Sequence, residues 1–164
     1  LRAHADDSTT EGWGVGDRYK NVSASDQFGQ QVDLYQFYGN VVLLDFSAGW
    51  CAPCRAVAKT AEAEYRERAD DGFVIVHMMF EDYSGNLPTK GFLQTWAAAS
   101  RLTFPVIYDP SVEDNLDGLY ESGLYKGSIP FMILLDRDMT IVQAVKGSNQ
   151  VDDLLSTADE LLAR

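Results

Sequence analysis

The stretch DFSAGWCAPCRAV, residues 45–57, constrains the fold more than any other part of the chain. It holds the only two cysteines among 164 residues, Cys51 and Cys54, and it overlaps the apolar run VVLLDF at 41–46. A short, continuous apolar run is typical of a strand that is buried on both faces of a sheet. Over residues 53–69, apolar side chains recur at helical spacing, with charged residues on the other side. We therefore predict a central strand followed by a helix that begins at the cysteine pair.

The position of the cysteines at a helix start indicates how each would react. A sulfur at the first turn lies beside unpaired backbone N–H groups and the positive end of the helix dipole, and both stabilise a thiolate. We therefore expect Cys51 to be the nucleophile. Cys54 lies one turn further on, close enough to attack a mixed disulfide on Cys51 and release the partner. Pro53, which a first helical turn tolerates, limits the flexibility of the segment between the two sulfurs.

A structural cross-link and a metal site are the other possible uses of two cysteines. A cross-link over so short a loop constrains the unfolded chain very little, because the entropic gain grows with loop length. A closed zinc site needs two further ligands, yet the only histidines are His4, in the N-terminal segment, and His77, inside an apolar run. We therefore predict no metal and favour a pair of working thiols.

Composition limits the partners of the chain. It has 25 acidic and 13 basic residues, a net charge of −12, which repels nucleic acid and anionic lipid surfaces. The longest apolar runs are interrupted by Asp45 and Asp136, so none is long enough to span a membrane. With 46% hydrophobic residues, the chain can bury the core of one domain without help from disulfides. We expect a monomer with no nucleic-acid partner and no inserted membrane segment.

The first residues, LRAHADDSTTEGWG, are polar and aperiodic and begin without methionine. They look like the stub that is left when a signal peptide or tag is cut away. We therefore predict a flexible tail over 1–14 and a single domain over 15–164. We favour an extracytoplasmic, periplasmic location, in which a removed N-terminal segment could also tether the protein to a membrane. A trimmed cytosolic protein is the alternative that stays open.

Short patterns predict the remaining elements. The β-prone stretches around Val22 and Val32 flank a turn signal and predict a hairpin. Apolar runs and helical periodicity predict the other strands and helices. Further strands are expected at 73–80, from 104 onward, at 130–136 and at 140–147, helices within 89–102 and at 151–162, and a short helical or irregular stretch at 111–124.

Two segments resemble the thioredoxins. VVLLDFSAGWCAPCRAV at 41–57 resembles their active-site segment, from the apolar strand through both cysteines to a basic residue. KGSIPFMILLDRDMTIVQAVKG at 126–147 is similar to their second landmark, a cis proline before an antiparallel strand pair, and Ile129-Pro130 fills the proline position. The leading hairpin and the extra segment at 81–103 resemble the larger TlpA/ResA-like redoxins of bacterial envelopes.

This resemblance covers about residues 15–164 and implies an α/β, thioredoxin-like fold. A central mixed sheet would be flanked by helices, with an N-terminal β-hairpin and a helical insertion. Asp45 stands six residues before Cys51, where thioredoxins have a buried aspartate that accepts the proton of the resolving thiol. Burial should raise the pKa of such a carboxyl, which suits a base that works near neutrality. The alternative is an aspartate at the end of the strand that is solvated or caps a backbone group.

The resemblance also implies substrate contacts by Trp50, Pro53, Ile129 and Pro130. Trp50 would cover the disulfide, and Pro130 would follow a cis peptide bond. An ordinary half-buried ring and an ordinary strand-edge proline are the alternatives, since only a minority of X-Pro bonds are cis. His77 falls where many thioredoxins have a lysine beside the buried aspartate, and a hydrogen-bonded core histidine is an equally good interpretation.

These residues together predict a thiol–disulfide oxidoreductase that reduces protein disulfides. The redox-active Cys51–Cys54 disulfide would need no other cofactor, and the partners would be disulfide-containing proteins and an upstream thiol electron donor. Oxidant members of the fold usually carry a histidine between the cysteines, where its charge stabilises the reduced form. The uncharged Ala52-Pro53 pair therefore favours a reductant.

Two other functions share the fold. Peroxiredoxins place a threonine or serine three residues before the peroxidatic cysteine and a proline four residues further back. Here those positions are Ala48 and Leu44, which disfavours a thiol peroxidase. A non-catalytic thioredoxin-like binding domain would typically have lost a cysteine or the proline, and this chain keeps both.

Overall fold

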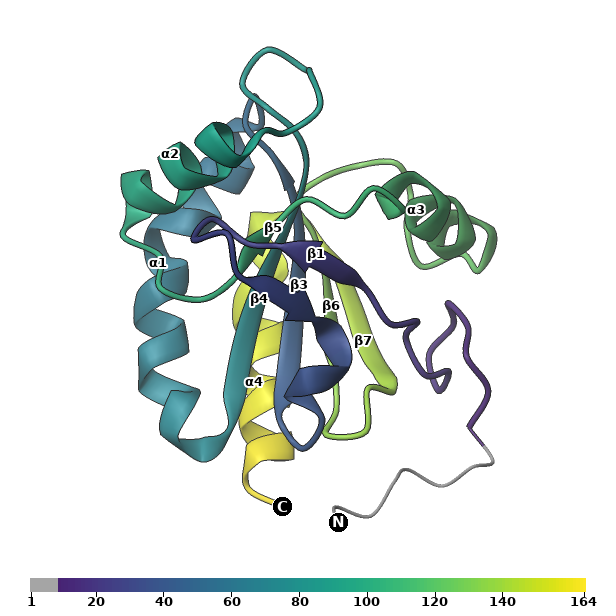
Figure 1. The fold of residues 1–164 in the computed structure, drawn as a ribbon. Helices are drawn as coiled ribbons and strands as arrows, with labels where there is room; N and C mark the ends of the chain where they lie inside the picture. The colour runs from purple at the N-terminus through teal and green to yellow at the C-terminus, as the bar shows by residue number, and fades with distance from the viewer. Residues whose placement is uncertain (1–8) are drawn as a thin grey trace.

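The computed structural model describes residues 9–164, which form a sheet and a hairpin with helices between several of the strands (Figure 1). The strands are β1 (Ser23–Ser25), β2 (Gln31–Asp33), β3 (Val41–Ala48), β4 (Phe73–Glu81), β5 (Val106–Ile107), β6 (Phe131–Leu135) and β7 (Ile141–Lys146). The α-helices are α1 (Ala52–Arg68), α2 (Lys90–Ser100), α3 (Val112–Glu121) and α4 (Val151–Leu162). Short 3-10 helices lie at Leu34–Phe37, Ala69–Asp71 and Ser148–Gln150.

The central sheet has the strand order β5-β4-β3-β6-β7. Strands β3, β4 and β5 run parallel, whereas β6 is antiparallel to β3 and β7 is antiparallel to β6. Strands β1 and β2 form a separate antiparallel hairpin. The predicted mixed sheet, hairpin and helical insertion are therefore confirmed, and α2 is the helix of the insertion.

The two faces of the sheet bury different partners (Figure 1). Helices α1, α2 and α4 pack against one face, and the β1–β2 hairpin and α3 pack against the other. Strand β3 lies at the centre, and all eight of its residues are buried. Its side chains alternate between the faces, so that Leu43 faces the helical cluster and Leu44 faces the hairpin.

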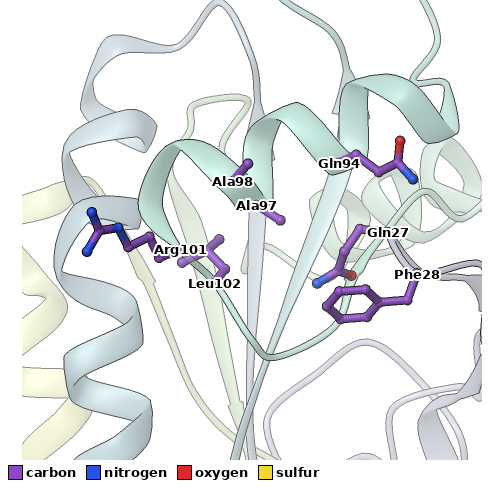
Figure 2. A pocket seen from close by; sticks show the side chains of 7 residues that line it. All are labelled: Gln27, Phe28, Gln94, Ala97, Ala98, Arg101 and Leu102. Carbon is purple, nitrogen blue, oxygen red and sulfur yellow. The ribbon is translucent and has the colours of Figure 1, made fainter.

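The hairpin turn covers the β5 edge of the sheet. Gln27 is buried, and its side-chain amide donates to Phe104 O at 2.9 Å and accepts from Val106 N at 2.8 Å. Asp26 forms an isolated antiparallel bridge with Ile107. Figure 2 shows Gln27 and the exposed Phe28 facing α2 across a shallow hollow of about 520 Å³. A side chain thus takes the place of a further strand at this edge.

Part of the predicted tail over residues 1–14 makes tertiary contacts, within residues 9–14, whereas residues 1–8 of that tail lie outside the described residues. Trp13 packs edge-on against Tyr19, with ring centroids 5.4 Å apart, and lies directly over Gly118 of α3. Two backbone carbonyls of this segment also accept hydrogen bonds: Arg18 N donates to Thr10 O, and Ser122 Oγ donates to Trp13 O, each at 2.9 Å. One partly buried indole ring and these hydrogen bonds thus join residues 9–14 to the domain, although the polar composition of the segment predicts no structure.

The turn between β6 and β7 places a residue other than glycine in the left-handed region. Met139 adopts a φ of 67° although it carries a side chain, and that side chain is fully buried. Its backbone N–H donates to Asp136 O, and its carbonyl accepts from Tyr19 N at 2.8 Å. Apolar burial and these hydrogen bonds offset the cost of the left-handed conformation.

Substitution of Gly118 by alanine tests how Trp13 of the N-terminal segment packs on α3. A Cβ at Gly118 would overlap the Trp13 indole, whereas a Cβ at Gly91, in α2, meets no atom closer than 3.8 Å. Alanine at Gly91 should raise the free energy of unfolding by up to about 1 kcal/mol through helix propensity. Alanine at Gly118 should instead lower it by about 1 kcal/mol, because displacing the ring outweighs the same gain. Urea unfolding would measure both values, and equal stabilisation by the two variants would contradict the described packing.

Candidate active site

The two cysteines form a disulfide at the N-terminus of α1. Their Cα atoms are 5.2 Å apart, and both residues are almost completely buried. Cys51 occupies the N-cap position, and its Sγ accepts a hydrogen bond from Cys54 N at 3.2 Å. This backbone N–H is one of the donors that a helix start leaves unpaired, so the sulfur of Cys51 is the one placed to be stabilised as a thiolate.

Strand β3 places Asp45 against α1, the helix that carries the cysteines. The Asp45 carboxyl is 1% exposed, and Ser47 Oγ donates to its Oδ1 at 2.9 Å. Burial raises the pKa of Asp45 to about 7, and the Ser47 hydrogen bond opposes that rise. The alternative of a solvated carboxyl at the strand's end is therefore wrong. A carboxyl with this pKa can both accept and return a proton near neutrality.

A small cavity lies between Asp45 and α1. Its volume is about 20 Å³, which is enough for one water molecule. Asp45, His77 and Thr60 line it together with Glu64, whose side chain is 31% exposed. The cavity therefore brings the buried carboxyl close to a group at the surface, which would allow a proton to be exchanged with solvent through one bound water.

His77 lies on β4 directly across from Asp45 in the strand register. It is fully buried, its Nδ1 accepts from Trp96 Nε1 at 3.0 Å, and its Nε2 lies 3.4 Å from Asp45 Oδ2. Burial lowers the pKa of His77 to about 3, so the ring is neutral near pH 7. Both interpretations that the sequence allows hold: His77 is a hydrogen-bonded core histidine, and it stands beside the aspartate.

The peptide bond between Ile129 and Pro130 is cis, as the sequence resemblance predicts. Strand β6 starts at the next residue and pairs with β3 so that Phe131 lies opposite Phe46. This register places Pro130 beside the end of β3 from which the cysteine turn departs. Pro130 is buried, and Ile129 is partly buried against both core clusters.

Trp50 and Pro53 lie on the outer side of the disulfide. Trp50 is 49% exposed and its indole N–H donates to the Glu81 carboxylate at the end of β4. Pro53, in the first turn of α1, is exposed. With about half of its surface exposed, Trp50 fits both an aromatic that flanks the disulfide and an ordinary half-buried ring.

The start of the insertion packs on the turn that precedes the cysteines. Gly49 N donates to Glu81 O at 3.0 Å, and a Cβ at Gly49 would lie only 2.6 Å from Tyr83 N. Arg55 Nη1 donates to Gly49 O at 2.7 Å and holds the turn from the other side. Tyr83, 45% exposed, therefore flanks the site, and sequence reasoning missed it together with Glu81 and Trp96. The glycine before Trp50 is the only local signal of this close approach.

Other features of the described residues stay outside this site. Within residues 9–164, no three metal-ligating side chains gather in one place. None of the described helices combines the length and the apolar character that a membrane-spanning helix requires. The hollow in Figure 2 is lined by none of the site residues named above.

Comparisons with known proteins agree with this geometry. Residues 15–146 match the model of the AhpC/TSA family. The thiol-disulfide oxidoreductase ResA of Bacillus thuringiensis is 24% identical over 140 residues, which cover 85% of this chain and 74% of ResA. ResA of Bacillus anthracis matches with the same identity and coverage.

Solved structures share the fold. A secreted thiol-disulfide isomerase from Corynebacterium glutamicum matches with a TM-score of 0.74 and 23% identity, over 100% of this chain and 98% of that one. The thioredoxin domain of a thiol-disulfide oxidoreductase from Bacteroides vulgatus matches with a TM-score of 0.71 and 23% identity, over 91% of this chain and 98% of that one. With a thioredoxin-like fold and a family match over most of its length, the chain belongs to the AhpC/TSA family.

Proposed function

We propose that this chain is a thiol–disulfide oxidoreductase that reduces disulfides in protein substrates. The observation that carries the proposal is the Cys51–Cys54 disulfide at the start of α1, on the helix that the buried Asp45 faces. Relatives named thiol-disulfide oxidoreductase support it, as does the cis Ile129-Pro130 bond, which precedes β6 beside the end of β3.

The reaction begins from the reduced dithiol. The Cys51 thiolate attacks one sulfur of a substrate disulfide, a mixed disulfide forms, and the other substrate sulfur leaves as a thiolate. Cys54 then loses its proton and attacks Cys51 Sγ, which forms the Cys51–Cys54 disulfide and releases the second substrate thiol. Two electrons pass from the dithiol to the substrate, and an upstream thiol donor returns them, so the reaction needs no other cofactor.

Asp45 serves as the proton acceptor for Cys54 in this scheme. Its carboxyl faces α1, and its pKa of about 7 lets it ionise in the range where the enzyme works. The cavity beside Thr60 and Glu64 supplies a place for the water through which the proton would leave.

Substrate would contact the exposed rim of the site. Trp50 and Tyr83 supply aromatic surface, and the exposed Pro53 lies in the first turn of α1. Ile129, which is partly exposed, would add an apolar contact beside the end of β3, and the buried Pro130 would hold that segment in place. Rigid aromatic and proline surfaces favour binding because little side-chain entropy is lost.

The family match does not by itself choose between a reductase and a peroxidase. The positions at which a peroxiredoxin would need a hydroxyl and a proline are Ala48 and Leu44, both inside the fully buried β3. Two cysteines at the same helix start suit thiol exchange, so we propose the reductase.

We also propose an extracytoplasmic location for the protein. A secreted thiol-disulfide isomerase and an exposed lipoprotein thioredoxin of Streptococcus pneumoniae are among its structural relatives. The proposed partners are proteins with disulfides that need reduction and a thiol donor in the same compartment.

The two cysteines should behave differently when each is replaced by serine. Cys51→Ser should abolish disulfide reduction in an insulin assay, because the sulfur that Cys54 N contacts is lost. Cys54→Ser should retain the first attack and accumulate a covalent mixed disulfide, which non-reducing electrophoresis detects. Trapping of substrate by the Cys51→Ser protein would reverse the two roles.

Asp45→Asn should slow turnover most at and just above pH 7. The carboxyl is ionised above its pKa of about 7, so in the wild type it can accept the Cys54 proton there. The asparagine side chain cannot accept that proton at any pH in this range. At high pH, Cys54 ionises unaided and the two rates should converge. Stopped-flow measurement of mixed-disulfide resolution from pH 6 to 9 would test this, and superimposable profiles would leave Asp45 a structural role only.

The reduction potential should lie nearer the thioredoxin value of about −270 mV than the DsbA value of about −120 mV. The uncharged Ala52 and the apolar Ile129 give the Cys51 thiolate no extra charge or hydrogen bond, so the reduced form is not strongly favoured. Equilibration with dithiothreitol measures the potential. A value above about −180 mV, the level of protein disulfide isomerase, would assign the protein to the oxidants.

A further inference from the structure

A continuous set of contacts links the insertion to the buried carboxyl. Trp96 of α2 is 3% exposed and donates its indole N–H to His77 Nδ1 at 3.0 Å. His77 Nε2 lies 3.4 Å from Asp45 Oδ2 and has no hydrogen-bond partner among the described residues. The three residues come from three different elements, α2, β4 and β3, and only the fold brings them together.

The Trp96 contact fixes where the proton of His77 resides. An indole nitrogen can only donate, so the Nδ1 that receives its hydrogen bond must lack a proton. A neutral imidazole carries one proton, which must then be on Nε2, the atom that points to Asp45. An N–H directed at a carboxyl favours the ionised form and disfavours the protonated one.

We propose that Trp96 positions His77 as the neutral tautomer with its proton on Nε2, and that this N–H sets the ionisation of Asp45. This role rests on the proposed function only in so far as Asp45 is the proton acceptor. His77 and Trp96 are positioning residues in this scheme, since they act on Asp45 and not on the reacting sulfurs. Through them, the helix of the insertion controls the pH at which the buried carboxyl becomes a base.

Two groups lie against the Asp45 carboxyl: the Ser47 hydroxyl, which donates to Oδ1 at 2.9 Å and does not titrate in this range, and the His77 ring, whose Nε2 lies 3.4 Å from Oδ2. From α1, Glu64 lines the same cavity but is held by Arg68 at 2.7 Å, and Cys51 and Cys54 titrate only when reduced. The side chains that α4 and β6 contribute to this cavity are apolar: Val151, Leu155 and Met132. Around His77 itself, the other aromatic neighbour is Phe104, with ring centroids 4.8 Å apart, and it offers no donor.

Nuclear magnetic resonance of protein labelled with ¹⁵N-histidine tests the tautomer directly. The chain has two histidines, so a His4→Gln variant assigns the signals of His77. The long-range ¹H–¹⁵N pattern should show a protonated Nε2 and a bare Nδ1 near pH 7. Carboxyl ¹³C titration of the same proteins, assigned with Asp45→Asn, measures the pKa of Asp45 in the oxidised and reduced states.

Trp96→Phe removes the indole donor and keeps an aromatic ring. It should let the His77 proton move to Nδ1, so that the Asp45 carboxyl loses the N–H dipole that lies 3.4 Å from Oδ2, and raise the Asp45 pKa by about one unit. Resolution of the mixed disulfide should then slow about fivefold at pH 7 and recover near pH 9, as follows from that change in ionised fraction. Trp13→Phe is the matched control at a distant indole, and Phe104→Leu is the control for packing on His77; both should leave the tautomer and the titration unchanged.

Two results would overturn the proposal. One is a wild-type His77 that carries its proton on Nδ1. The other is a folded Trp96→Phe protein in which Asp45 titrates as in the wild type, with a His77→Phe variant giving the same answer. If the Trp96→Phe shifts occur while Asp45→Asn leaves turnover unchanged, the positioning role stands and the proposed base role of Asp45 fails, so the two ideas are tested separately.

Discussion

Strand β3 is buried along its whole length, and the site depends on this constraint. Neighbouring strands on both sides satisfy its backbone, so the only polar groups left to pair are side chains. Asp45 finds one donor, Ser47, inside the same strand, and it meets His77 on the next strand. The same strand runs directly into the turn at Gly49 and the cysteines, so one rigid element positions the disulfide and the carboxyl together.

The buried Asp45 and His77 make the folded state respond to pH in opposite ways. In the folded protein the pKa of Asp45 is raised to about 7, so between about pH 4 and 7 the unfolded chain releases a proton that the folded chain keeps, and stability falls as pH rises. The pKa of His77 is lowered to about 3, so between about pH 6.5 and 3 the unfolded chain binds a proton that the folded chain excludes, and stability falls as pH falls. The two slopes oppose each other between about pH 4 and 6.5. A buried ionisable pair can thus serve chemistry with little net dependence of stability on pH in that range.

Local patterns in the sequence are sufficient to predict most of the fold and the reacting atoms. The apolar run of β3, the periodicity of α1 and the Cys51–Cys54 spacing each lie within one short segment. The role of Asp45 and the cis bond at Pro130 come from resemblance, and burial of the first and geometry of the second agree with it.

The contacts that could not be predicted from the sequence join residues that are distant along the chain. Trp96 and His77 are 19 residues apart, and Trp50 and Glu81 are 31 apart. No periodicity within either segment encodes such contacts. The first arises only when α2 packs on β4, and the second only when the turn after β3 lies beside the end of β4. The order of residues 9–14 was missed for the same reason, because Trp13 is held by Gly118 and Tyr19 of other segments.

The side chain of Gln27 limits which backbone groups at the β5 edge remain open to another molecule. An open edge strand exposes a row of backbone donors and acceptors to which a strand of another molecule can add, which is how sheets grow into aggregates. At β5 the amide of Gln27 already occupies Phe104 O and Val106 N, and the hairpin turn lies across the remainder. Because the blocking group is a side chain on a tight turn, it presents no new edge in its place. The hairpin therefore ends the sheet at five strands and leaves these two backbone groups unavailable to a strand of another molecule.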